Sequence, residues 1–364
     1  MKNEQEVKLD RLRRLMADSQ LDAIWLRRLS SFAWLTAGAA SHVSIGDEHG
    51  IASLLITPEV VHLITNNIEA PRLMAEEELA EGAYQWHIHP WHTPASPLAI
   101  LPESSCVGSD EPYPGTHDLS KQISQLRSLL TPEETIRMRH VGRRCADSVR
   151  ATVERIEPGM SELQIAGILA AESIERGVTP LVNLIAADER VYQFRHPLPT
   201  ANRLERYAMV VLSGRRHGLI ASVSRLVHFG RIQEELAARA LAVARVDATM
   251  IARTRPGVAL NDIFQAGVDA YQSAGYPDEW LHHHQGGVSG YEGREEKGTP
   301  TATTVVQAGQ AYAWNPSIAG AKSEDTIIVG EDDNEIITST PDLPTIMIDI
   351  DGRMIPRPAI WERA

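Results

Sequence analysis

The sequence lacks the features that mark several large classes of protein. Basic residues are not in excess: the sequence has 35 lysines and arginines and 48 aspartates and glutamates, which gives a net charge of −13. Phosphate binding needs a clustered basic surface, so this balance speaks against a nucleic-acid partner. No apolar run approaches the roughly 20 residues that a membrane-spanning helix needs. We therefore expect no nucleic-acid partner and no membrane partner.

Cysteine is scarce as well. The chain has two, Cys106 and Cys145, and their positions fit neither a metal site nor a redox pair. Such scarcity is typical of a reducing compartment. The opening stretch, MKNEQEVKLDRLRRLM, is charged throughout and lacks the apolar core of a signal peptide. A cytoplasmic protein is the expectation.

What is present is an ordinary globular composition, with 43% hydrophobic and 23% charged residues. A chain of 364 residues is longer than a single hydrophobic core usually supports, which predicts two domains. Apolar runs and turn residues in the first part predict an α/β layer. The predicted elements are a helix over 7–20, buried strands over 21–26, 51–57 and 60–65, a turn at Pro58-Glu59, and a loop over 107–117.

A second domain is predicted to open with a long helix over about 132–156. Thr131 is a suitable N-cap, Pro132 suits the first helical position, and Glu134 completes a capping box. The domains are therefore placed at 1–130 and 131–364.

The second domain contains a weak internal repeat, in which residues 156–177 resemble residues 254–275. Each copy has a Pro-Gly turn, a helix and a terminal glycine, with Ser161 and Asn261 as the expected caps. Two related α/β halves would enclose a shared cleft, a usual place for a binding site. The alternative is that the two segments are unrelated and share only the residues that commonly begin a helix.

Four local strings, in this order, carry a resemblance to a known family. They are HGLIASVSRLV (217–227), HHQGGVSG (283–290), WNPSIAG (314–320) and KSEDTIIV (322–329). Over about residues 131–340 the chain resembles the creatinase/prolidase/aminopeptidase P family. The resemblance implies an α/β (α+β) protein: a small N-terminal creatinase-like domain, then a pita-bread domain with a pseudo-twofold internal repeat.

Metallopeptidases of that family hold two metal ions with two aspartates, one histidine and two glutamates. The bound ions generate a nucleophilic hydroxide. Carried over through the motifs, the five ligand positions fall at Leu212, Ser222, Gly287, Asn315 and Glu324. One carboxylate survives, which is too few for a dinuclear centre. The resemblance therefore implies no metal and no other cofactor.

Creatinase, which the chain also resembles, works without metal and uses a histidine as acid and base. The histidine that matches it is His196, in QFRHPLPT (193–200). A histidine titrates near neutrality and can move a proton when a partner fixes its tautomer. Glu324 is the second catalytic candidate, because burial without a cation is expected to raise the pKa of its carboxyl. The alternative for His196 is an exposed loop residue without a role.

Substrate binding is assigned to residues around these two. Arg294, in YEGREEKG (291–298), matches an arginine of creatinase that binds a substrate carboxylate, although the string also fits a solvated charge run. Of the triplet 282–284, strand alternation would point some members inward and others outward. The histidines of WHIHPWH (86–92) could suggest a metal cluster, but they are interpreted as surface or interface residues. The predicted substrate-binding set is Arg294, Asn315, Ser222, His283 and Tyr291.

Three functions remain open from the sequence. The leading hypothesis is a metal-independent hydrolase or lyase that cleaves a C–N bond in a small, polar, carboxylate-bearing substrate. The second is a non-catalytic pseudo-peptidase that binds a small molecule or a protein, since fold does not dictate function. The third, least favoured, is an Xaa-Pro metallopeptidase. The resemblance also implies a homodimer.

Overall fold

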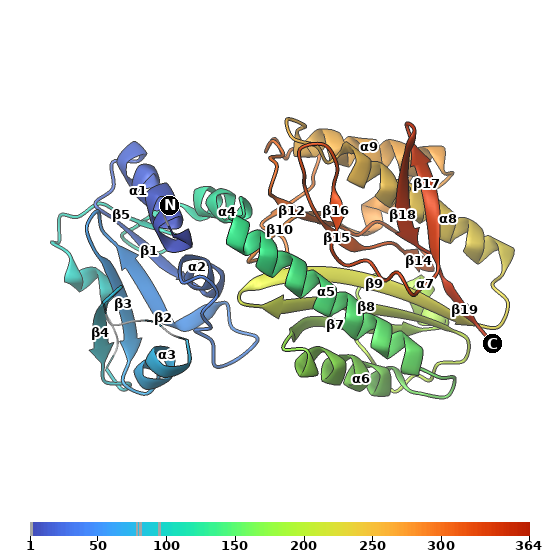
Figure 1. Cartoon of the computed structure of the whole chain (residues 1–364), viewed down its shortest axis with the longest axis horizontal. Helices are drawn as coiled ribbons and strands as arrows, with labels where there is room; N and C mark the ends of the chain where they lie inside the picture. The colour runs from blue at the N-terminus through green and yellow to red at the C-terminus, as the bar shows by residue number, and fades with distance from the viewer. Residues whose placement is uncertain (1–2, 78, 80–81, 94–95) are drawn as a thin grey trace. The chain divides into compact units, whose positions relative to one another are not determined.

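The chain forms two compact units in the computed structural model, which describes residues 3–77, 79, 82–93 and 96–364 (Figure 1). The first unit runs to Glu134 and includes His217–Leu219, and the second contains Thr135–Arg216 and Ile220–Ala364. Among the described residues, no helix is both long enough and apolar enough to cross a membrane.

A six-stranded mixed sheet forms the first unit, in the order β4-β3-β2-β1-β5-β6. Its central strands β1, β2 and β3 pair antiparallel, whereas β4 and β5 add parallel neighbours. The strands are β1 (Ala23–Arg28), β2 (His49–Ile56), β3 (Val61–Asn66), β4 (Gln85–His89), β5 (Val107–Ser109) and β6 (His117–Asp118). The helices are α1 (Glu4–Asp18), α2 (Leu29–Leu35), α3 (Ala70–Glu76), η1 (Pro97–Ile100) and α4 (Ser120–Ser128).

The predicted strands of this unit are confirmed, with ends shifted by a residue or two. The turn at Pro58-Glu59 joins β2 to β3, where the Thr57 N–H donates to the Val60 carbonyl at 2.9 Å. Helix α1 begins earlier than predicted, because Asn3 forms a capping box with Glu6. The predicted loop over 107–117 is wrong in part: β5 occupies its start and pairs with β1, a long-range contact that its glycine and proline content conceals.

Two sheets and five α-helices make up the described second unit. The sheets run β11-β10-β12-β15-β16 and β19-β9-β8-β7, with the small hairpins β13-β14 and β17-β18. The helices are α5 (Pro132–Arg155), α6 (Glu162–Glu175), α7 (Glu189–Gln193), α8 (Glu234–Arg253) and α9 (Leu260–Ser273), with the 3-10 turn η2 (Glu279–His282). The strands are β7 (Thr179–Ala187), β8 (Tyr207–Arg216), β9 (Leu219–Phe229), β10 (Gly286–Ser289), β11 (Glu296–Lys297), β12 (Ala311–Trp314), β13 (Ser317–Ile318), β14 (Ala321–Lys322), β15 (Asp325–Ile328), β16 (Glu335–Ile336), β17 (Thr345–Ile350), β18 (Arg353–Pro358) and β19 (Trp361–Arg363).

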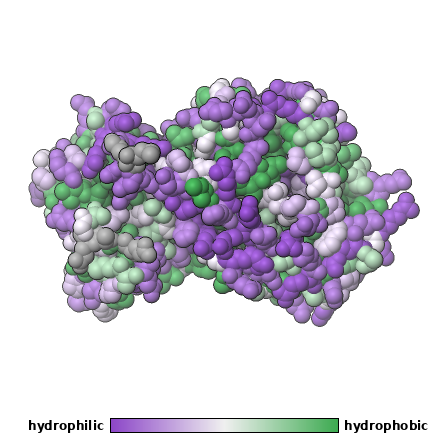
Figure 2. Space-filling model, viewed as in Figure 1, coloured by the Kyte–Doolittle hydropathy of each residue, from purple (hydrophilic) through white to green (hydrophobic). Residues whose placement is uncertain are grey.

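The start of α5 confirms the predicted capping box. The Thr131 hydroxyl accepts from the Glu134 N–H at 3.2 Å, and the Glu134 carboxylate accepts from the Thr131 N–H at 2.7 Å. These two bonds satisfy donors that the first turn of a helix otherwise leaves free. The outer face of α5 is polar, and Figure 2 shows a mainly hydrophilic surface where this helix crosses the view.

The two copies of the sequence repeat share their turns but not their caps. Gly159 and Gly257 have φ values of +91° and +87°, so both Pro-Gly turns use a glycine in the left-handed region. Ser161 caps α6 as predicted. The prediction for Asn261 is wrong: Ala259 is the N-cap of α9, because its bridge with Val305 fixes where the helix begins.

A buried ionic network ties four elements of the second unit together. The Arg357 guanidinium of β18 contacts Asp247 of α8 at 2.6 Å and Asp325 of β15 at 2.8 Å. Arg225 of β9 contacts the other oxygen of Asp325 at 2.9 Å. All four side chains are at most 3% exposed, so each charge depends on its partners for the solvation that water would give.

Removing the Arg357 guanidinium should therefore destabilise the fold strongly. The substitution Arg357→Met leaves Asp247 and Asp325 short of a buried partner, and we expect a loss of about 3–5 kcal/mol in the free energy of unfolding. Arg353→Met, on the same strand, removes an exposed contact with Asp333 and should cost about 1 kcal/mol or less. Urea denaturation of both variants checks this, and equal losses would contradict it.

Candidate functional site

His196 lies in the loop that follows α7, and two contacts hold this loop. The preceding residue, Arg195, forms an ion pair with Glu279 of η2. On the other side, Arg190 Nη2 donates to the Leu198 carbonyl at 2.9 Å. Because η2 leads directly to His283, the first contact holds His196 next to the segment that precedes β10.

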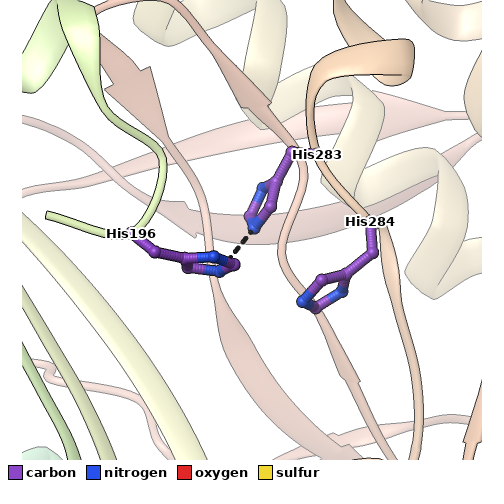
Figure 3. Close-up of side chains that lie close together, drawn as sticks. All are labelled: His196, His283 and His284. Carbon is purple, nitrogen blue, oxygen red and sulfur yellow. Dashed lines mark hydrogen bonds between the residues drawn. The ribbon is translucent and has the colours of Figure 1, made fainter.

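Three imidazoles meet there, those of His196, His283 and His284, which we call the histidine cluster (Figure 3). The His196 and His283 Nε2 atoms lie 3.1 Å apart, so the N–H of one ring donates a hydrogen bond to the lone pair of the other. His283 Nδ1 contacts the Ser317 hydroxyl at 3.0 Å. His283 is buried, His284 is partly buried, and His196 is exposed.

The expectation that neighbouring histidines alternate between inside and outside holds only in part. His282 ends η2 and is exposed, whereas His283 and His284 both join the histidine cluster. Strand alternation does not apply to them, because both precede β10 in irregular chain. In the first unit, His87 contacts His62 at 3.0 Å, and among the described residues the histidine cluster is the one group with metal-ligand spacing.

Protonation of the histidine cluster is disfavoured. Burial, with the nearby charge of Lys322, lowers the pKa of His283 far below its usual range. Burial and the charges of Arg294 and Lys297 lower the pKa of His284 to about 4. Desolvation, together with Lys322, also lowers the pKa of His196. The three rings are therefore neutral at pH 7 and each keeps one nitrogen lone pair.

Glu324 lies beside these rings and has cationic partners of its own. Lys322 Nζ is 2.9 Å from Oε2, and Arg294 Nη2 is 3.3 Å from Oε1. The Ser224 hydroxyl donates to Oε2 at 2.5 Å. All four side chains are largely buried, and we call them the Glu324 cluster.

The expected rise in the pKa of Glu324 is wrong. Burial acts in that direction, but the charges of Lys322 and Arg294 and the Ser224 hydrogen bond outweigh it and lower the pKa. Glu324 is thus a fixed carboxylate at neutral pH. It counterbalances cations and is a poor proton donor.

The other predicted binding residues lie on strands around these clusters. Ser222 is fully buried on β9, and its hydroxyl lies 2.9 Å from that of Ser213 and 3.4 Å from Arg294 Nη1. Asn315 follows β12 and is 3% exposed, and its Oδ1 has no hydrogen-bond partner among the described residues. Tyr291 is buried, and its N–H donates to Glu295 at 3.0 Å in the turn before Arg294. Their roles in binding stay predictions.

The residues at the five expected ligand positions do not fit a dinuclear metal centre. Leu212 is a fully buried core residue, and the oxygens of Glu324 are already held by two cations and a hydroxyl. Gly287 cannot carry a ligand side chain as it stands. A Cβ there would lie 2.1 Å from the Glu296 carbonyl oxygen, at a φ of +149°.

With this geometry in hand, comparison with known families is informative. The model of metallopeptidase family M24 matches residues 136–331, and that of the creatinase/prolidase N-terminal domain matches residues 8–139. These matches and the fold define a two-domain protein of the M24 family type, with a pita-bread second domain. The chain belongs to metallopeptidase family M24, which confirms the resemblance to creatinase, prolidase and aminopeptidase P.

Individual relatives are distant. An uncharacterized peptidase of Staphylococcus haemolyticus is 23% identical over 231 residues, which span 61% of this chain and 65% of that protein. An Xaa-Pro dipeptidase of Lactobacillus helveticus is 23% identical over 69% of this chain and 71% of its own length. The solved Xaa-Pro dipeptidase from Bacillus anthracis has a TM-score of 0.77 at 17% identity, covering 93% of this chain and 98% of that one.

The same fold also occurs in a subunit of a protein complex. The N-terminal domain of the FACT complex subunit SPT16 from chickpea has a TM-score of 0.70 at 14% identity, covering 93% of this chain and 96% of that one. At such identities the likeness shows the fold alone.

Sequence reasoning missed two members of the site, Lys322 and His284. Lys322 stands two residues before Glu324, a spacing that places side chains on one face of extended chain. This spacing, within a segment whose other residues are mostly buried, could have shown that Lys322 lies beside Glu324. His284 had none, because its direction depends on the irregular path before β10.

The close approach at Gly287 can be tested directly. We expect Gly287→Ala to lower the free energy of unfolding by about 1–3 kcal/mol, because the new Cβ overlaps the Glu296 carbonyl of the paired strand β11. The matched control is Gly293→Ala, whose Cβ would have no described atom within 4 Å and should be nearly neutral. Urea denaturation measures both. A fully stable Gly287→Ala protein would mean that a ligand side chain fits here after all.

Proposed function

We propose that this chain is a hydrolase that works without the dinuclear metal centre of its family. Its proposed reaction is cleavage of a C–N bond in a small, carboxylate-bearing substrate. One observation carries the proposal: the surviving acidic residue, Glu324, is held by Lys322 and Arg294. A carboxylate neutralised by two cations is a poor ligand for a divalent ion, which would have to displace both.

Neutral imidazoles supply the proposed proton transfer. His196 is exposed to solvent and lies 3.1 Å from His283, so it can take a proton from a substrate water while His283 stabilises its position. The resulting hydroxide attacks the carbon of the C–N bond, and the proton passes to the leaving nitrogen. The Ser317 hydroxyl fixes the orientation of the His283 ring in this pair.

Fixed positive charges supply the proposed substrate anchoring. Lys322 and Arg294 face the buried site, and the charge of Lys297 reaches His196 and His284. Arg294 uses Nη2 for Glu324, while its buried Nε has no partner among the described residues. A substrate carboxylate bound to Arg294 and Lys297 would place its neighbouring C–N bond near His196.

The test uses a panel of guanidino, ureido and N-acyl amino acids with the chelator-treated full-length chain. We expect one class to be cleaved without metal, and His196→Ala to decrease kcat/KM by about 100-fold or more. His282→Ala is the matched control, because it removes an exposed neighbouring histidine outside the cluster.

Two outcomes would contradict the proposal. Binding of panel members without turnover would favour a binding protein, the second hypothesis, since a fold does not dictate a function. Cleavage of Xaa-Pro dipeptides that requires added manganese would favour the activity named for the dipeptidase relatives.

A further inference from the structure

The histidine cluster has the composition and spacing of a metal-binding site. One nitrogen from each of His196, His283 and His284 lies within 4.8 Å of the other two. Three nitrogen ligands of a tetrahedral zinc ion, bonded at about 2.0 to 2.1 Å, lie about 3.3 Å apart. The His196–His283 pair, at 3.1 Å, is already close to that separation. The other separations are at most 4.8 Å, which exceeds the ideal distance by about 1.5 Å and is within reach of side-chain rotation.

The rings are also oriented for such a role. Figure 3 shows the three side chains converging from two segments of the chain, with His196 opposite His283 and His284. His283 Nδ1 is engaged by the Ser317 hydroxyl, which leaves its Nε2 directed toward His196. Ser317 is fixed in turn, because its N–H donates to the Tyr271 hydroxyl at 2.8 Å. A hydrogen bond to the second ring nitrogen is the usual support of a metal-binding histidine.

His284 gives an independent observation. Its Nδ1 is buried and has no hydrogen-bond partner among the described residues. This nitrogen is therefore available to an ion or a water, so His284 can add a third donor to the pair. The ring centroid of His284 lies 4.8 Å from that of His283 and 5.7 Å from that of His196.

We propose that His196, His283 and His284 bind a single transition-metal ion of the zinc, cobalt or nickel class. None of the three stands at a position where the family resemblance places a metal ligand. Imidazole nitrogens favour these ions, whereas magnesium, calcium and manganese prefer oxygen. Lys322 and Lys297 oppose a dication and Glu324 favours it, so moderate affinity is expected.

Such an ion has a consequence that rests on the proposed function. It would bind Nε2 of His196 and displace the hydrogen bond to His283 that positions this ring in the proposed reaction. Zinc would therefore inhibit the hydrolase, although the family uses metal to activate water. The proposal that the cluster binds a metal does not depend on the proposed hydrolase activity, because it rests on the geometry of the histidine cluster alone.

The experiment titrates the chelator-stripped full-length chain with Co²⁺ and follows the visible absorption bands of the bound ion. We expect one Co²⁺ per chain with intense bands of low-symmetry nitrogen coordination, and displacement by Zn²⁺. His284→Ala should weaken the affinity about tenfold or more. His282→Ala should leave it unchanged, because that side chain lies outside the cluster. Mn²⁺ should not compete at equal concentration.

Two results would overturn the proposal. One is a Co²⁺ affinity of His284→Ala equal to that of the unchanged chain. The other is a loss of Co²⁺ affinity in His62→Ala, which would place the ion at the His62–His87 pair. Because His284 is partly buried, His284→Gln serves as a second variant that keeps a polar side chain, and circular dichroism checks its fold. These readouts need no turnover, so a chain that binds Co²⁺ but cleaves nothing refutes the proposed function and leaves the metal site standing.

Discussion

The buried pairing of Asp325 with two arginines fixes the segment on which the candidate site is built. Arg225 and Arg357 approach its two oxygens from different strands, and Asp247 shares Arg357. Ser323, two residues earlier, donates to Asp247 from the same side of the chain. In extended chain the intervening residues point the opposite way, so this network aims its neighbours into the site. The stability of the second unit and the direction of the site residues therefore have one origin.

On the other side of that segment, positive charge is supplied by side chains. Lys322 and Arg294 neutralise Glu324 in a region where the family resemblance places metal ions. An ammonium or guanidinium group can stabilise a developing negative charge, but it does not coordinate water and lower its pKa as a metal ion does. A reaction here must therefore obtain its base from elsewhere. The neutral ring of His196 is the side chain that can meet this requirement.

Local chemistry was predictable from the sequence, and long-range contacts were not. The cap at Thr131 was foreseen because capping depends on residues three apart. The strand inside 107–117 was missed because it exists through pairing with β1, and Asn261 was misplaced because a bridge to a distant segment sets the helix start. The family could be identified from motifs, whereas the assignment of the five ligand positions stays a prediction. The pKa direction of Glu324 could not be predicted, since Arg294 reaches it from another part of the chain.

The contact at Gly287 limits which side chains this part of the site can hold. Its Cα faces the Glu296 carbonyl across the pairing of β10 with β11, so the backbone has filled the volume that a histidine would need. Installing a histidine at this position would require that pairing to open before the new side chain could bind an ion. A single substitution there would lower the stability of the fold before it offered a ligand. The chemistry open to this site is therefore limited by the backbone of its sheet, and a new activity would have to use the imidazoles already present.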